Sequence, residues 1–276
     1  MRRANKLPKI NEKRVLQILN LLAPFIAGAM TLALDEGSGS WENVFVDESL
    51  TKLLTPAPIA FAIWGPIFIL MGLFYLYQAR DLLPGWEEVE MPFIHQVGVF
   101  FLLSTVMSTV WFVTWARRMI WVSLAAMILY LITILAAYFR LGINTHTRAM
   151  RERLFVTAGW SMYAGWVTVA ALVNTTTGLV YAGFDNLPFT ELQWTITACI
   201  VAVVIYLVFL FYRRDTVFAG VGAWALIGLS ITHLDPAPPS NFIVLLTSSV
   251  GAAVILVSIL LRYASKTSHR SISPMN

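Results

Sequence analysis

The sequence predicts an all-α protein, a polytopic bundle of transmembrane helices. Of its 276 residues 58% are apolar and 12% are charged, whereas an ordinary soluble domain has about 25% charged residues. Eight stretches contain no Asp, Glu, Lys or Arg, and most of them reach the roughly 20 residues that a helix needs to cross about 30 Å of hydrocarbon. A membrane β-barrel is excluded, because its strands alternate polar and apolar residues and these stretches do not.

Eight helices are expected in order along the chain. Their ranges are 15–34, 58–78, 96–116, 119–139, 154–176, 193–212, 216–232 and 241–261. The first follows a charged segment, but it is long for the apolar part of a signal peptide, so we predict a helix that is retained. Pro58 begins the second, at a position where the missing N–H of proline has no helical partner to lose. The segments between these helices are too short to build a core of their own.

The basic residues indicate the orientation in the membrane. Eight spans place both termini on one side, and assigning that side to the cytoplasm gives it 16 of the 19 Lys and Arg residues. Only Lys52, Arg117 and Arg118 remain on the far side, as the positive-inside rule requires. We therefore predict cytoplasmic termini, and the lack of an evident organelle signal favours the plasma membrane. The net charge of +4 then reflects topology, so no nucleic-acid partner is expected.

Several classes of chemistry lack the side chains they need. The eight stretches contain no Asp, Glu, Lys, Arg or His. Proton relays and ion coupling would therefore lack the ionisable side chains that they need inside the membrane. Neither a Ser-His-Asp set nor a P-loop nor an HExxH sequence is present. The single cysteine, Cys199, permits no internal disulfide. We predict no catalytic residue, no metal site and no required cofactor, which favours a binding protein over an enzyme.

Three helices carry faces of aromatic and small polar residues. These faces comprise Trp64 and Phe68 in the second helix, Trp111 and Trp115 in the third, and Tyr163, Trp166 and Asn174 in the fifth. Steps of three or four residues keep each set on one side of its helix, and the predicted topology puts all three sets in the far-side half of the membrane. They predict a pocket for a flat, apolar ligand, with rings for stacking and a few polar groups for orientation. Packing between helices explains the same spacing, and both interpretations remain open.

The fifth-helix segment resembles a signature of the translocator protein family, TspO/MBR, also called tryptophan-rich sensory proteins. That signature reads roughly P-Y-L-A-W-V-T-F-A-x-x-L-N, and the residues in its register are Tyr163, Trp166, Val167, Thr168, Ala170 and Asn174, with Met162 at the position of the proline. The second helix is similar to the family pattern W-x-x-x-Y-x-x-M-G at Trp64, Phe68, Met71 and Gly72. Trp111 fits the tryptophan of L-N-x-x-W, with Ser108 in place of the asparagine.

The resemblance covers about residues 15–183, the five helices of a typical family member. It implies a TspO-like core in residues 1–183 and three additional helices with a cytoplasmic tail in residues 184–276. It also implies a pocket that receives porphyrins and related tetrapyrroles, closed by the first far-side loop. The family's loop motif W-Y-x-x-L-x-K-P is not preserved, since Trp41 and Lys52 stand at a different spacing.

The leading hypothesis is a multipass membrane protein that binds a porphyrin or haem-like tetrapyrrole among the seven residues of the three faces, for sensing or transport. One alternative is an enzyme that degrades porphyrin in light, with Trp64 and Trp166 as the tryptophans that the resemblance implies. Another is a facilitative transporter that uses all eight helices. The expected partners are the lipid bilayer and a small hydrophobic ligand. A homo-oligomer is possible because Gly220, Ala223 and Gly228 would permit close helix approach.

Overall fold

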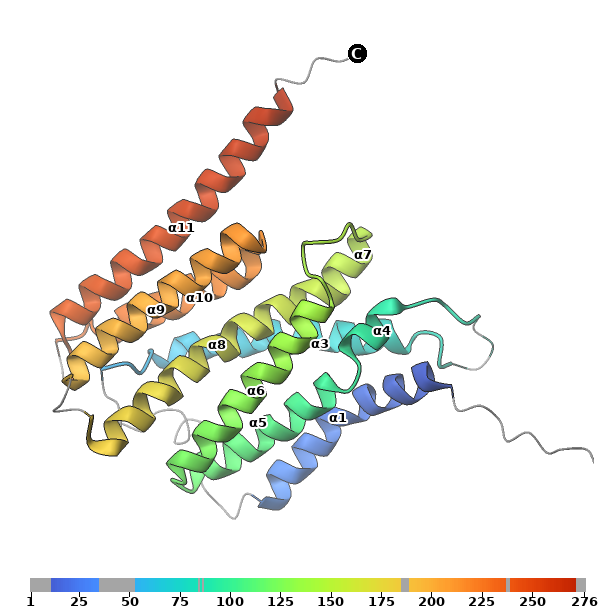
Figure 1. The fold of residues 1–276 in the computed structure, drawn as a ribbon, viewed down its shortest axis with the longest axis horizontal. Helices are drawn as coiled ribbons and strands as arrows, with labels where there is room; N and C mark the ends of the chain where they lie inside the picture. Colours follow the sequence, from blue (N-terminus) through green and yellow to red (C-terminus); the bar gives the residue numbers. More distant parts are fainter. Residues whose placement is uncertain are drawn as a thin grey trace, which may run out of the picture.

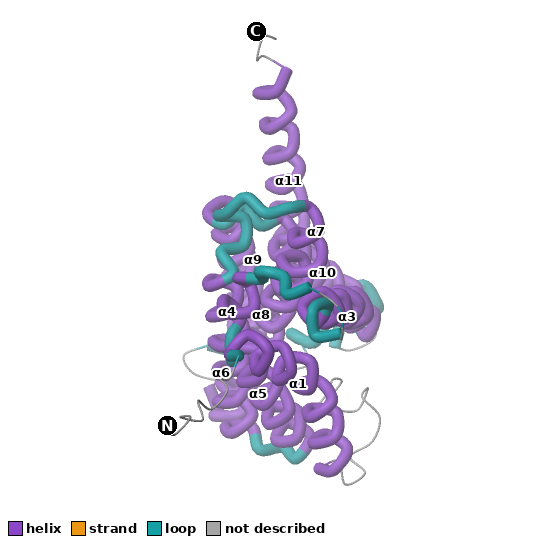
Figure 2. The backbone as a smooth tube through the Cα atoms, turned by 90° about the vertical axis from the view of Figure 1, so that its right-hand side faces the viewer, coloured by secondary structure: helices purple, strands orange, loops and turns teal. Residues whose placement is uncertain are grey.

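The computed structural model describes residues 11–34, 53–83, 85, 87–184, 189–236 and 239–271. Within these ranges the regular structure is entirely helical (Figure 2), which confirms the predicted fold class. Six helical segments of the described chain are long and apolar enough to cross a membrane, and two apolar helices of 17 residues, Phe100–Ala116 and Thr216–Thr232, are shorter. Each of the eight predicted stretches therefore forms a helix.

The first two predicted helices lie close to their expected ranges. Helix α1 spans Glu12–Leu34. The second stretch begins with a 3₁₀ helix, η1, at Pro58–Ile63 and continues as α3 over Trp64–Ala79. Pro58 lies in the first turn of η1. Proline is tolerated there because a backbone N–H in the first turn has no hydrogen-bond partner within the helix.

The predicted helix over 96–116 is wrong at its beginning. The chain instead forms a short helix α4, Pro92–Val97, and then α5, Phe100–Ala116. Gly98 separates the two with φ of 52°, a left-handed backbone conformation that glycine adopts without a Cβ penalty. Helix α6 follows at Ile120–Arg140.

The fifth stretch is longer than predicted. A continuous helical run consists of α7 (Met150–Glu152), a π turn η2 (Arg153–Thr157), α8 (Ala158–Leu179) and η3 (Val180–Phe184). Helix α9 spans Glu191–Tyr212, and Thr190 and Gln193 form a capping box at its N-terminus. Helix α10 spans Thr216–Thr232. The last helix, α11 at Phe242–Ser271, projects beyond the others at its C-terminal end (Figure 1).

Helix α8 is the centre of the bundle. In Figure 1, α6 and α8 lie between α1 and α5 on one side and α9, α10 and α11 on the other. Helix α8 contacts α3, α6, α9 and α10, and 15 of its 22 residues are buried. The predicted aromatic face of this helix is therefore surrounded by protein, whereas many apolar residues of α9 and α11 are exposed, as expected for helices that face lipid.

Helix α10 and η1 approach each other closely. A Cβ added at Gly228 would lie 2.5 Å from the Cβ of Ala60, so only glycine fits at this crossing. Ala223 is also buried. Two of the three small residues that suggested an oligomer contact thus serve packing inside the chain.

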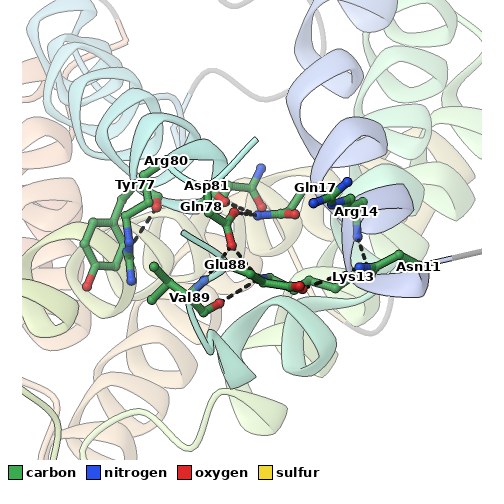
Figure 3. A network of polar contacts seen from close by, with 10 residues as sticks. All are labelled: Asn11, Lys13, Arg14, Gln17, Tyr77, Gln78, Arg80, Asp81, Glu88 and Val89. Carbon is green, nitrogen blue, oxygen red and sulfur yellow. Dashed lines mark hydrogen bonds and ion pairs between the residues drawn. The ribbon is translucent and has the colours of Figure 1, made fainter. Parts of the chain in front are cut away.

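A buried carboxylate ties α1 to the end of α3 (Figure 3). Asp81 accepts hydrogen bonds from Gln17 Nε2 at 2.6 Å and from the Val89 amide at 3.1 Å, and it forms an ion pair with Lys13. Burial by itself would raise the pKa of Asp81. The three donors and the positive charge of Lys13 outweigh burial and hold this pKa below its usual value.

We expect the ionisation of Asp81 to make the stability of the fold depend on pH. Because the pKa of Asp81 is lowered on folding, its contribution is complete above the unfolded value of about 3.9 and is lost as the pH falls through the lower folded value. Thermal unfolding of Asp81→Asn should therefore show a lower Tm at pH 7, and a smaller loss of Tm than the wild type between pH 5 and pH 2. Glu87→Gln, an exposed neighbour, is the control. Equal acid sensitivity of Asp81→Asn and wild type would contradict the assignment.

Candidate functional site

A cavity lies between η1, α3, α5, α6 and α8, with about 770 Å³ of space that no atom fills. The cavity is partly open, so this volume includes space that is continuous with the surroundings of the protein. Its aromatic lining consists of Phe61, Trp64, Trp111, Trp115, Tyr130 and Trp166. Its aliphatic lining consists of Pro56, Met127, Val167, Val169, Ala170 and Val173. Thr55 and Asn174 supply further polar atoms.

Five of the seven predicted site residues border this cavity. They are Trp64, Trp111, Trp115, Trp166 and Asn174. Tyr163 does not line it, but its hydroxyl is hydrogen-bonded to that of Tyr130, which does. The three faces identified in the sequence thus converge on one volume.

Phe68, also predicted as a site residue, does not line the cavity. Its side chain is 64% exposed and stacks on Trp64 with ring centroids 5.3 Å apart. A step of four residues rotates a side chain by about 40° around a helix, which takes Phe68 past the edge of the cavity. An exposed aromatic ring costs little in a membrane, since lipid tails are as apolar as a protein core.

Two aromatic contacts are nearly perpendicular where η1 and α3 face α8. The indoles of Trp64 and Trp166 lie 6.5 Å apart at 84°, and Phe61 meets Trp166 at 5.7 Å and 89°. Edge-to-face contacts of this kind stabilise a pair of rings by about 0.5 to 1.5 kcal/mol beyond their burial. They fix the orientation of the indole planes at this wall of the cavity.

Sequence reasoning missed two parts of the lining. Met127 and Tyr130 come from α6, which carries no pair of tryptophans that would mark it in the sequence. Ser123, Met127, Tyr130 and Ile134 are all buried, and their spacing of four, three and four would have identified the inward face of this helix. Thr55 and Pro56 precede the second helix, and no periodic pattern indicates where such a segment lies.

Some polar groups near the cavity already have hydrogen-bond partners within the protein, and others do not. Trp111 Nε1 donates to Asn174 Oδ1 at 2.9 Å, and Asn174 Nδ2 donates to the Ala170 carbonyl at 2.9 Å. Ser108, at the family's asparagine position, donates to the carbonyl of Thr105 in its own helix. By contrast, no hydrogen bond joins the indole N–H of Trp64 or Trp166 to the part of the chain that the structure describes. Both residues line the cavity.

The Trp111–Asn174 hydrogen bond is expected to couple α5 to α8. Interhelical hydrogen bonds in membranes contribute about 0.6 kcal/mol on average and up to about 1.7 kcal/mol. A double-mutant cycle with Trp111→Phe and Asn174→Ala, read by unfolding in mixed micelles, should give a coupling energy of about 1 kcal/mol. Strictly additive effects would show that the contact does not contribute to stability.

A second, smaller cavity lies on the other side of α8. It contains about 390 Å³ and is lined by apolar residues of α8, α9 and α10 together with Leu54 and Pro56. Pro56, Val169 and Val173 border both cavities. These three residues therefore form a wall that the two cavities share.

The described residues contain no candidate metal centre, and they do not include the first far-side loop. Across these ranges, no group of three or more His, Cys, Asp or Glu residues could hold a metal ion. The first far-side loop, which the resemblance implies as a cover, includes residues 35–52, and these lie outside the described residues together with Trp41 and Lys52.

Comparison with known proteins places the chain in a family. A family model described as "TSPO-like protein" matches residues 16–261. The match continues past the five helices that carry the sequence resemblance and includes the three that follow. No curated protein and no solved structure matches the chain.

Proposed function

The chain belongs to the TSPO-like family, and from this premise we propose that its aromatic cavity binds a porphyrin or related tetrapyrrole for sensing or transport. It is an integral membrane protein with multiple apolar helices. One observation carries the proposal: Trp64, Trp111, Trp115 and Trp166, from three separate helices, border a single cavity. A flat conjugated ring is the ligand whose shape and polarisability match such a lining.

Two kinds of interaction would hold the ligand. Burial of its faces against indole rings and aliphatic side chains provides affinity at about 25 cal/mol per Å² of apolar area, less the cost of association. The indole N–H groups of Trp64 and Trp166 would donate to a carboxylate at the edge of the ring, since hydrogen bonds to charged groups are stronger than those between neutral groups. Stacking favours flat rings in general, and the two donors favour rings with acidic edges.

A porphyrin titration tests this function. Protoporphyrin IX is added to purified protein while tryptophan fluorescence is followed. We expect saturable quenching, and an affinity at least roughly tenfold weaker in Trp64→Ala and Trp166→Ala, because each variant removes a stacking face and a donor. Trp121→Ala is the matched control, since Trp121 is 55% exposed and does not line the cavity. Equal affinity in wild type and both cavity variants would refute the proposal.

Illumination of the same complex separates binding from degradation. A binding protein leaves the porphyrin spectrum unchanged in light, apart from the bleaching that free porphyrin shows. A new absorbing product that forms only with the protein, and not with the Trp64→Ala or Trp166→Ala variants, would favour the enzyme instead.

We further propose that both termini lie in the cytoplasm and that the protein resides in the plasma membrane. The support for this orientation is the distribution of the basic residues, 16 of 19 on one side. Reporter fusions at the C-terminus that are active only in the cytoplasm would agree with it. Activity only on the opposite side would reverse the topology.

A further inference from the structure

The backbone that leads into the second helix is held by helices from the other end of the chain. We define the lead-in segment as residues 53–60. Its contacts with α9 and α10 are Leu53 N–H to Glu191 Oε1 (3.1 Å), His233 Nε2 to Leu53 O (2.9 Å), Thr232 Oγ1 to Thr55 O (3.0 Å), Ala57 N–H to Gly228 O (3.0 Å) and Trp224 Nε1 to Ala60 O (2.8 Å). Five hydrogen bonds thus join this segment to helices that follow it by more than 130 residues.

These contacts meet a physical need of the segment. Backbone groups ahead of a helix have no intrahelical partner, and groups within the membrane find no water to replace one. Pro56 and Pro58 lack an N–H altogether, which leaves the segment rich in carbonyl acceptors. The side chains of Trp224, Thr232 and His233 supply donors to three of these carbonyls.

His233 fixes the position of the segment most specifically. It is 3% exposed, and its Nδ1 accepts the Asn241 N–H at 3.1 Å. The hydrogen of the ring is therefore on Nε2, which donates to Leu53 O. One imidazole thus joins the lead-in segment to the connection between α10 and α11.

The same segment is a wall of the aromatic cavity. Thr55 and Pro56 line it, and Pro56 also borders the smaller cavity against α9 and α10. Gly228 lies against Ala60 without space for a Cβ, so α10 supports this wall by packing as well as by hydrogen bonds. Pro56 therefore separates the aromatic cavity from the smaller cavity, and any displacement of the segment would change this shared wall.

We propose that α9 and α10 latch the lead-in segment shut over the cavity, with Trp224, Thr232 and His233 as positioning residues, and that opening of this latch limits ligand entrance and escape. The ligand part of this inference rests on the proposed function. Helices α9 and α10 would then set the exchange rates of the ligand without lining the aromatic cavity themselves.

The test uses the full-length double variant Trp224→Phe, Thr232→Val. It removes two donors to the segment while keeping an aromatic ring and a β-branched side chain in place. Ser230→Ala is the matched control, since Ser230 is a buried α10 residue whose hydroxyl bonds to Ser248 on α11 and not to the segment. The first readout is amide hydrogen exchange of the peptide containing residues 53–60, without ligand. The second is the pair of porphyrin association and dissociation rates.

We expect exchange of the segment to become at least roughly tenfold faster in the double variant, the effect of losing two hydrogen bonds from the closed state. The control should remain at the wild-type rate. Both porphyrin rates should rise by a similar factor while Kd stays nearly constant, because a rarely open latch limits passage in both directions. A residue that only stabilised the fold would not change the two rates together.

Unchanged exchange at residues 53–60 would overturn the latch. Faster exchange with unaltered porphyrin rates would overturn its role in ligand passage. If the wild type binds no porphyrin, the proposed function fails while the exchange result still decides whether α10 holds the segment.

Discussion

Replacing Ala170 by tryptophan is expected to abolish porphyrin binding while the protein remains folded. Ala170 lies on the α8 wall of the cavity, one turn from both Trp166 and Asn174. An indole at this position would occupy the space in which the ligand stacks, whereas the backbone carbonyl that accepts from Asn174 is unaffected. We expect an affinity loss of at least roughly 100-fold, about 3 kcal/mol.

The stability of this variant distinguishes a filled cavity from a damaged core. Insertion of a large side chain into a tightly packed core costs about 1 to 3 kcal/mol, whereas an empty cavity accommodates it at lower cost. The thermal midpoint of Ala170→Trp should therefore stay near that of Val204→Trp, which adds an indole at a position on α9 that is 54% exposed. Porphyrin binding by Ala170→Trp with wild-type affinity would show that the ligand binds elsewhere.

Loss of the Asp215 carboxylate is expected to be among the most destabilising single changes. Asp215 is 1% exposed and caps the start of α10, with Oδ1 accepting the amides of Val217 and Phe218 at 3.1 and 3.0 Å. Its Oδ2 accepts from the hydroxyls of Tyr138 on α6 and Ser161 on α8. One side chain therefore fixes the positions of three helices.

Asp215→Ala should lower the free energy of unfolding by about 3 kcal/mol or more, since it removes a helix cap and leaves two buried hydroxyls without their acceptor. Unfolding in mixed micelles measures this. Ser161→Ala, which removes one donor only, should cost about 1 kcal/mol. Asp215→Asn keeps an oxygen for the cap and should fall between them. A loss in Asp215→Ala no larger than in Ser161→Ala would contradict this account.

The helices were predictable because the membrane imposes a simple constraint. A span must be long and apolar throughout, so the absence of charges identified each stretch, including the 17 residues at 216–232 that form α10. The break at Gly98 was not predicted, because apolar residues continue on both sides of it and a positive φ leaves no hydrophobic signal. The burial of Asp81 and Asp215 could not be predicted either. Each residue lies just beyond the end of a span, and a charged residue at such a position is usually exposed.

The site was predictable where it depends on helical periodicity. Trp64, Trp111, Trp115, Trp166 and Asn174 were found because spacing places them on common faces. Phe68 shared the spacing but lies beyond the edge of the cavity. Contacts such as Ala57 to Gly228 join segments far apart in the chain, and no pattern within either segment indicates the other.

The most direct test is the structure of the full-length protein with bound protoporphyrin IX in a lipid nanodisc. The account predicts density for a flat ring in the cavity, in contact with the indoles of Trp64 and Trp166 and beside Ala170. Ring density against the exposed Phe68, in the smaller cavity between α8, α9 and α10, or only in the surrounding lipid would contradict it.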